Sequence, residues 1–158
     1  MKPSSTERTQ NAAEELNLPI ELREMSASTR TAEEAAQACA CTLGQIVKSL
    51  VFQGAKSNSL LLLLIAGDKQ MDLEVAAQTI GEPLIRADPK RVRKETGFAI
   101  GGVAPIGHLT PMPIWMDNNL LKHDKVWAAA GAPNMVFEVS PTMLAEKVGA
   151  KVANLTSA

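Results

Sequence analysis

Two aliphatic segments constrain the fold of this chain more than any other feature of its sequence. They run from Ile46 to Phe52 and from Leu60 to Ala66, and a polar stretch from Gly54 to Ser59 separates them. Segments that are apolar on both faces are typical of strands in the middle of a sheet, because other parts of the chain must cover each face. We therefore expect two neighbouring strands at the centre of a sheet.

Capping signals and apolar periodicity predict helices around these strands. Ser4 with Glu7, and Thr31 with Glu34, each fit a capping box. One helix is expected after Ser4, and further helices are expected at 31–44, 72–80, 88–97 and 140–149. Further strands are expected at 20–25, 84–87, 98–100, 114–116, 126–129, 135–139 and 152–155. Because helices and strands do not alternate regularly, and a Gly-Ala-Pro turn at 131–133 predicts an antiparallel hairpin, the sequence predicts an α+β fold.

Composition limits the size and the class of the protein. With 158 residues, 46% of them hydrophobic, the chain suits one domain over 1–158, of which 1–19 is expected to be an N-terminal helical extension. A net charge of −1 argues against a protein that depends on a large positive field over nucleic acid, but is compatible with a local basic patch. The aromatic content of 3% argues against stacking platforms for unpaired bases.

The cellular compartment is predicted from the apolar segments and the cysteines of the sequence. The longest aliphatic run is far shorter than the roughly 20 residues of a membrane span. Cys39 and Cys41 lie two residues apart in a predicted helix, so their side chains point in different directions and are expected to be small buried groups rather than a disulfide. We expect a cytoplasmic protein with no membrane contact.

Lys48 is the first candidate functional residue. By strand alternation it shares a face with Ile46, Leu50 and Phe52, so an ammonium group projects from an otherwise apolar strand. Such a lysine either extends to water along its aliphatic stem or stands in a cleft, where it holds an anion or polarises a carbonyl. Spacing alone does not decide between these alternatives.

A glycine-rich run from Thr96 to His108 is the second candidate feature. Gly101 and Gly102 would let backbone N–H groups approach a ligand, and Pro105 fixes the loop, although an ordinary tight turn explains the same residues. His108 either orients a substrate or makes a structural hydrogen bond. The run fits no nucleotide-binding glycine motif.

No familiar hydrolytic constellation is present in the sequence. No serine lies in a G-x-S-x-G motif, and His108 and His123 form no zinc-ligand cluster, so neither a metal nor another cofactor is expected. Asp72 and Asp117 precede predicted helices and are interpreted as caps. Five basic residues around the helix at 88–97 form either a tRNA-facing patch or a solvated helix face: Arg86, Lys90, Arg91, Arg93 and Lys94.

Taken in order along the chain, these features resemble the YbaK/prolyl-tRNA-synthetase-associated editing domain family. The resemblance covers Leu22 to Leu155. A helix at 31–36 leads into the strand that carries Lys48, Ala66-Gly67-Asp68 follows, and the run T-G-x-x-x-G-G-x-x-P-x-G-H occupies 96–108.

The resemblance implies both a fold and a reaction. The fold would be α+β, with a mixed barrel-like sheet and flanking helices. The reaction would be hydrolysis, in trans, of the ester that joins a wrong amino acid to tRNA, typically a small amino acid on tRNA for proline. Lys48 would be the active-site cation, Gly101 and Gly102 would present backbone groups to the ester, and Ser26, Thr29, Pro105 and His108 would bind substrate. Water positioned near an activated ester needs no protein nucleophile.

Two alternatives to this function stay open at the level of sequence. The same cleft would serve a non-catalytic module that binds an aminoacyl or nucleotide end, or a hydrolase of another small acyl ester. Mischarged tRNA is the expected partner of the deacylase, which would find it alone or by docking to a prolyl-tRNA synthetase or another synthetase. The sequence predicts neither the amino acid removed nor the oligomeric state.

Overall fold

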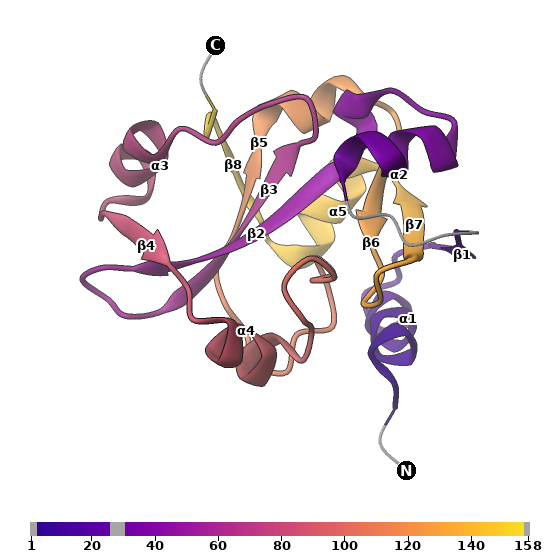
Figure 1. The fold of residues 1–158 in the computed structure, drawn as a ribbon, viewed down its shortest axis with the longest axis horizontal. Helices are drawn as coiled ribbons and strands as arrows, with labels where there is room; N and C mark the ends of the chain where they lie inside the picture. The colour runs from indigo at the N-terminus through magenta and orange to yellow at the C-terminus, as the bar shows by residue number, and fades with distance from the viewer. Residues whose placement is uncertain (1–2, 26–30, 157–158) are drawn as a thin grey trace.

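The computed structural model describes residues 3–25 and 31–156, which form a layered α+β domain (Figure 1). The helices are α1 (Ser5–Glu15), α2 (Ala32–Cys39), α3 (Leu73–Ile80), α4 (Pro89–Thr96) and α5 (Pro141–Val148), with 3-10 turns η1 (Leu43–Gln45) and η2 (Asn118–Lys122). The strands are β1 (Leu22–Glu24), β2 (Val47–Gly54), β3 (Leu60–Ala66), β4 (Leu84–Arg86), β5 (Ile114–Asp117), β6 (Val126–Ala129), β7 (Met135–Val139) and β8 (Lys151–Ala153). No helix within the described ranges has the length and apolar character needed to cross a membrane.

The strands form two sheets. The larger has the order β4-β2-β3-β5-β8, with antiparallel pairing of β2 to β3 and β4 and parallel pairing of β5 to β3 and β8. The smaller, β1-β7-β6, is antiparallel and contains the hairpin predicted at 131–133. The expectation of a mixed sheet with flanking helices is confirmed, and β2 and β3 are the central pair.

The two sheets approach each other without closing into a true barrel. A parallel bridge between Ile46 and Trp127 connects them. Beyond this bridge β2 pairs with β4 only from Phe52 to Gly54, so the middle of that edge of β2 has no partner strand among the described residues.

The side chains of β3 point alternately to its two faces and divide the core into two parts. All seven residues of this strand are buried. Leu62 and Leu64 enter the larger core, which also receives side chains from α1, α4 and α5, whereas Leu61 and Leu63 enter a smaller core that contains Ala76 of α3. Both faces of β3 are therefore covered, as its composition predicted.

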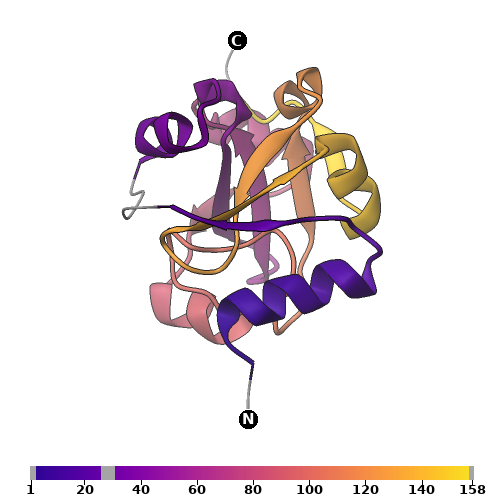
Figure 2. The same cartoon turned by 90° about the vertical axis from the view of Figure 1, so that its right-hand side faces the viewer.

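Helix α1 lies along one side of the molecule and packs against the larger core (Figure 2). Ser4 caps the helix by accepting a hydrogen bond from the N–H of Glu7, as predicted. Thr9 and Ala13 of α1 are completely buried. This helix therefore contributes to the same core as the sheets.

Two local predictions are wrong. Helix α2 ends at Cys39 rather than near Gly44, because Ala40 adopts a left-handed conformation with φ of 55°. No strand forms at 98–100: the hydroxyl of Thr96 accepts a hydrogen bond from the N–H of Phe98 and also lies within 3.2 Å of its carbonyl oxygen. These side-chain bonds occupy the backbone groups that a neighbouring strand would need.

Candidate functional site

A cavity of about 630 Å³ lies between the unpaired edge of β2 and the hairpin of β6 and β7. Helix α2 borders it at one end, and β4 with the start of α4 borders it at the other. The lining residues are Thr31, Ala32, Ala35, Ile46, Val47, Lys48, Ser49, Leu50, Val51, Phe52, Arg86, Ala87, Pro89, Ile100, Gly101, Val103, Trp127, Ala128, Ala129, Ala132, Pro133, Met135 and Val136. The wall is mainly apolar, with a few polar groups, which is typical of sites for small molecules.

The free edge of β2 brings main-chain polar groups to this cavity. The N–H of Gly67 donates to the carbonyl of Ile46 at 2.7 Å, so the peptide groups of Ile46 and of alternate residues after it face β3. Those of Val47, Ser49 and Val51 consequently face the opposite edge, where the cavity lies. A ligand in the cavity can therefore meet peptide donors and acceptors as well as side chains.

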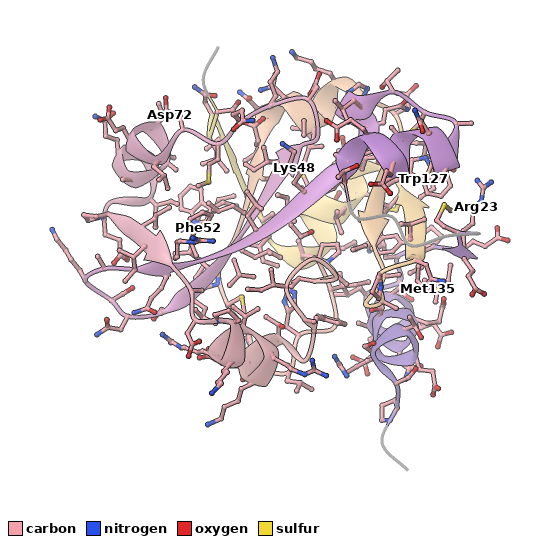
Figure 3. The ribbon with its side chains drawn as sticks, viewed as in Figure 1. Arg23, Lys48, Phe52, Asp72, Trp127 and Met135 are labelled. Carbon is pink, nitrogen blue, oxygen red and sulfur yellow. The ribbon has the colours of Figure 1, made fainter. Side chains whose placement is uncertain are left out.

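Lys48 is held in a defined position beside this edge. Its side chain is half-buried, and Nζ donates a hydrogen bond of 2.7 Å to the carbonyl oxygen of Lys69 in the loop after β3. Figure 3 shows Lys48 on β2 at the end of the strand nearer α2, and Phe52 towards β4. The ammonium group keeps two further N–H donors, so it can hold an anion or polarise a carbonyl without leaving Lys69.

Ser49, the neighbour of Lys48, also lines the cavity. Its hydroxyl oxygen is buried and has no hydrogen-bond partner within the described part of the chain. A buried hydroxyl without a partner costs about 1–3 kcal/mol, so native proteins seldom keep one.

The glycine-rich loop reaches the cavity through Gly101. This residue has φ of 93°, a conformation that suits glycine, and a Cβ placed on it would meet no atom within 4 Å. Gly102 is buried, and its N–H donates to the carbonyl of Ala99, which closes a tight turn. The structure therefore places Gly101 in the cavity wall and Gly102 behind it.

Comparison with known proteins identifies the family of this chain. A family model described as the aminoacyl-tRNA editing domain matches residues 26–147. The chain belongs to the aminoacyl-tRNA editing domain family.

Three relatives of this editing domain extend the comparison. A crystal structure described as a candidate trans-editing enzyme for prolyl tRNA synthetase has a TM-score of 0.92, is 45% identical, and all of both chains is covered. The uncharacterised protein YwhH of Bacillus subtilis is 33% identical over 136 residues, 86% of each chain. EbsC of Enterococcus faecalis, named as a candidate Cys-tRNA(Pro)/Cys-tRNA(Cys) deacylase, is 25% identical over 128 residues, 80% of this chain and 77% of EbsC.

The remaining predicted substrate-binding residues occupy other positions in the editing domain. Pro105 is buried and His108 is half-buried, and neither lines the cavity. Nε2 of His108 lies 2.7 Å from the carbonyl oxygen of Ala104, and burial lowers the pKa of His108. Ser26 and Thr29 lie outside the described residues.

The predicted basic residues divide into two groups. Arg86 lines the cavity, and it lies opposite Phe52 where β4 pairs with β2. Lys90, Arg91, Arg93 and Lys94 lie on α4 beyond the cavity lining, and Arg91 pairs with Glu95.

The carboxylates predicted to be caps have that role. Asp72 accepts hydrogen bonds from the N–H groups of Glu74 and Val75 at the start of α3. Asp117 is completely buried, caps η2 and accepts a hydrogen bond from the N–H of Leu155. Within residues 3–25 and 31–156, no cluster of three or more His, Cys, Asp or Glu side chains could hold a metal ion.

Cysteine chemistry does not fit this site. Burial raises the pKa of Cys39 to about 11, with a further contribution from the neighbouring Cys41. Burial also raises the pKa of Cys41. Because the thiolate is the nucleophilic form, neither side chain is activated for attack on an ester.

Sequence reasoning missed the residues of the opposite cavity wall. Trp127 and Met135 come from β6 and β7 and line the cavity. Figure 3 labels both to the right of β2. Ala132 and Pro133 of the turn between these strands also line it. The hairpin itself was predicted, but nothing in the local pattern shows that it stands opposite the free edge of β2.

Proposed function

We propose that this editing domain is a trans-acting aminoacyl-tRNA deacylase, and that it hydrolyses the ester of tRNA for proline charged with a small wrong amino acid. The observation that carries the proposal is that Lys48, whose ammonium group is tethered to the carbonyl of Lys69, lines an apolar cavity whose wall includes Gly101. Membership of the editing family and the names of two relatives support the reaction class and the choice of tRNA.

The chemistry requires little from the protein, because an aminoacyl ester is already activated. Water adds to the ester carbonyl, negative charge develops on the carbonyl oxygen, and the bond to the ribose oxygen breaks. The products are the free amino acid and a tRNA with a free terminal hydroxyl. Lys48 is the cation that stabilises the developing charge, and the loop at Gly101 limits how the ester sits.

The cavity wall favours an uncharged amino acid side chain. Alanine methyl groups and branched aliphatic side chains form most of the lining, so an apolar group is accommodated at low cost. A carboxylate or ammonium on the amino acid side chain would lose its hydration against this wall. Such a pocket discriminates only modestly between amino acids of similar size.

A panel of mischarged tRNAs tests the proposal directly. The wild-type protein should release amino acid from at least one tRNA that carries a small wrong amino acid, and Lys48→Ala should release it far more slowly. Lys147→Ala, which removes an exposed lysine from α5, is the matched control and should behave as wild type. Saturable binding of an aminoacyl-adenosine analogue without hydrolysis of any ester would instead establish the non-catalytic module.

The route by which substrate arrives is part of the same proposal. One relative is described as acting for prolyl tRNA synthetase. We extend this relation to the present chain, which would receive mischarged tRNA that such a synthetase has released.

A further inference from the structure

The two ends of the cavity differ in charge. Helix α2 borders the Lys48 end, and its first turn carries Glu33 and Glu34 with no basic residue in the helix. The segment 86–96 borders the other end and contains five basic and two acidic side chains. The net charge of the whole protein is −1, so the segment 86–96 is more positive than the average of the chain.

The acidic side chains near the basic end are already engaged. Asp88 caps α4 through the N–H of Lys90, and Glu95 pairs with Arg91. Lys90, Arg93 and Lys94 are exposed on α4. Their charges remain available to a partner.

The basic segment is continuous with the cavity. Arg86, Ala87 and Pro89 all line it, so the first residues of α4 are at its rim. Ile100, whose side chain is 60% exposed, lines the cavity beside Gly101. Figure 1 shows α2 near the start of β2 and α4 below the strand, on the side of β4.

From this difference in charge we infer the direction in which bound tRNA extends out of the cavity. The acceptor end of the tRNA passes over Arg86 and the exposed face of α4, and the amino acid points towards Lys48 and α2. Phosphates follow the basic side because Arg and Lys neutralise them and release counterions, whereas a path over Glu33 and Glu34 would place like charges together. This inference rests on the proposed function for the identity of the ligand.

Charge reversal on α4 tests the direction. Arg93→Glu with Lys94→Glu should lower kcat/KM for mischarged tRNA at least tenfold at 0.1 M salt. The same variant should cleave a minimal aminoacyl-adenosine ester within twofold of wild type, because that substrate lacks the phosphates. The salt dependence of tRNA binding should also become shallower, by about 0.7 in the log–log slope for each phosphate that the variant no longer neutralises.

A matched variant separates local from total charge. Lys122→Glu with Lys147→Glu changes the net charge equally at exposed positions that do not line the cavity. We expect it to keep wild-type kcat/KM within twofold. An equal loss in both double variants, or an equal loss on tRNA and on the minimal ester, would overturn the inference.

A binding measurement tests the tRNA path independently of whether the protein hydrolyses an ester. Uncharged tRNA for proline should bind at least tenfold more weakly to the α4 double variant than to the Lys122/Lys147 double variant. If the wild type hydrolyses no ester, the proposed function fails, and this comparison still supports or overturns the tRNA path. Equal affinity in the two variants would refute the path even in an active deacylase.

Discussion

Nζ of Lys48 donates a hydrogen bond to the carbonyl oxygen of Lys69 at 2.7 Å, which ties a strand residue of the cavity to the loop after β3. A lysine that only extended to water would need no such acceptor. The contact holds the ammonium group against the loop after β3, and Lys48 lines the cavity. A tethered cation has less conformational freedom to lose when it meets an ester.

Gly101 has a matched control elsewhere in the chain. Gly101 and Gly81 have φ of 93° and 101°, and a Cβ on either meets no atom within 4 Å. Alanine at either position should therefore cost a similar amount of stability, about 1–2 kcal/mol, because only the backbone conformation is strained. Only Gly101→Ala should also lower kcat/KM for mischarged tRNA, by tenfold or more, in parallel urea unfolding and deacylation assays. Equal activity of the two variants would remove Gly101 from the site.

Arg8 fastens α1 to the glycine-rich loop. Its guanidinium donates to the carbonyls of Gly97 and Gly107 and lies 4.7 Å from the ring centre of Phe98. Arg8→Met should lower the free energy of unfolding by about 2 kcal/mol, since hydrogen bonds from charged donors are removed from a partly buried site. Arg23→Met, which removes a cation–π interaction with Trp127, should cost less than about 1 kcal/mol. Similar destabilisation of the two variants would show that the Arg8 interactions contribute little.

The sequence predicted the elements better than their mutual placement. Strands β2 and β3 follow from aliphatic content, and α1, α3, α4 and α5 from caps that the structure confirms. Phe98 looked like a strand residue because it is apolar and follows a helix, but the hydroxyl of Thr96 engages its backbone. Local side-chain competition of this kind is invisible to periodicity.

The candidate site was predictable only in part for a related reason. Lys48 could be identified because a charge in an apolar strand is unusual, and Gly101 because paired glycines mark a turn. Trp127 and Met135 carry no such signal: they join the site through the bridge between the two sheets, a contact between segments about 80 residues apart. His108 followed the glycine run in sequence, yet its ring turns to the carbonyl of Ala104.

Removal of the hydroxyl should have different effects on the free energy of unfolding at Ser49 and at Thr96. The hydroxyl of Ser49 is buried without a partner among the described residues, so Ser49→Ala should leave the free energy of unfolding unchanged or raise it by up to about 1 kcal/mol. The hydroxyl of Thr96 bonds to Val92 and Phe98, so Thr96→Val should lower it by about 1–3 kcal/mol. Urea denaturation measures both. Destabilisation by Ser49→Ala comparable to that of Thr96→Val would mean that Ser49 has a structural partner.

His108 should make stability depend on pH. Burial lowers its pKa from the ordinary value of 6.5, Ala104 partly offsets this, and Arg8 lowers it further. The unfolded chain then binds more protons between the two pKa values, so the free energy of unfolding falls as pH drops below about 6.5. His108→Gln should lack this part of the decrease, which unfolding curves at pH 7.5 and 5.5 would reveal. The same pH dependence in both proteins would assign the effect to other groups.

The most direct test of the role of Lys48 compares kcat/KM for one mischarged tRNA in wild type, Lys48→Ala and Lys147→Ala, with urea unfolding of all three. We expect Lys48→Ala to lower kcat/KM at least a hundredfold, the scale expected when a group that stabilises developing charge is removed. Its stability should stay within about 1 kcal/mol of wild type, because only one hydrogen bond, that to Lys69, is removed. Lys147→Ala should match wild type in both measurements. A folded Lys48→Ala protein that deacylates as fast as wild type would contradict this role.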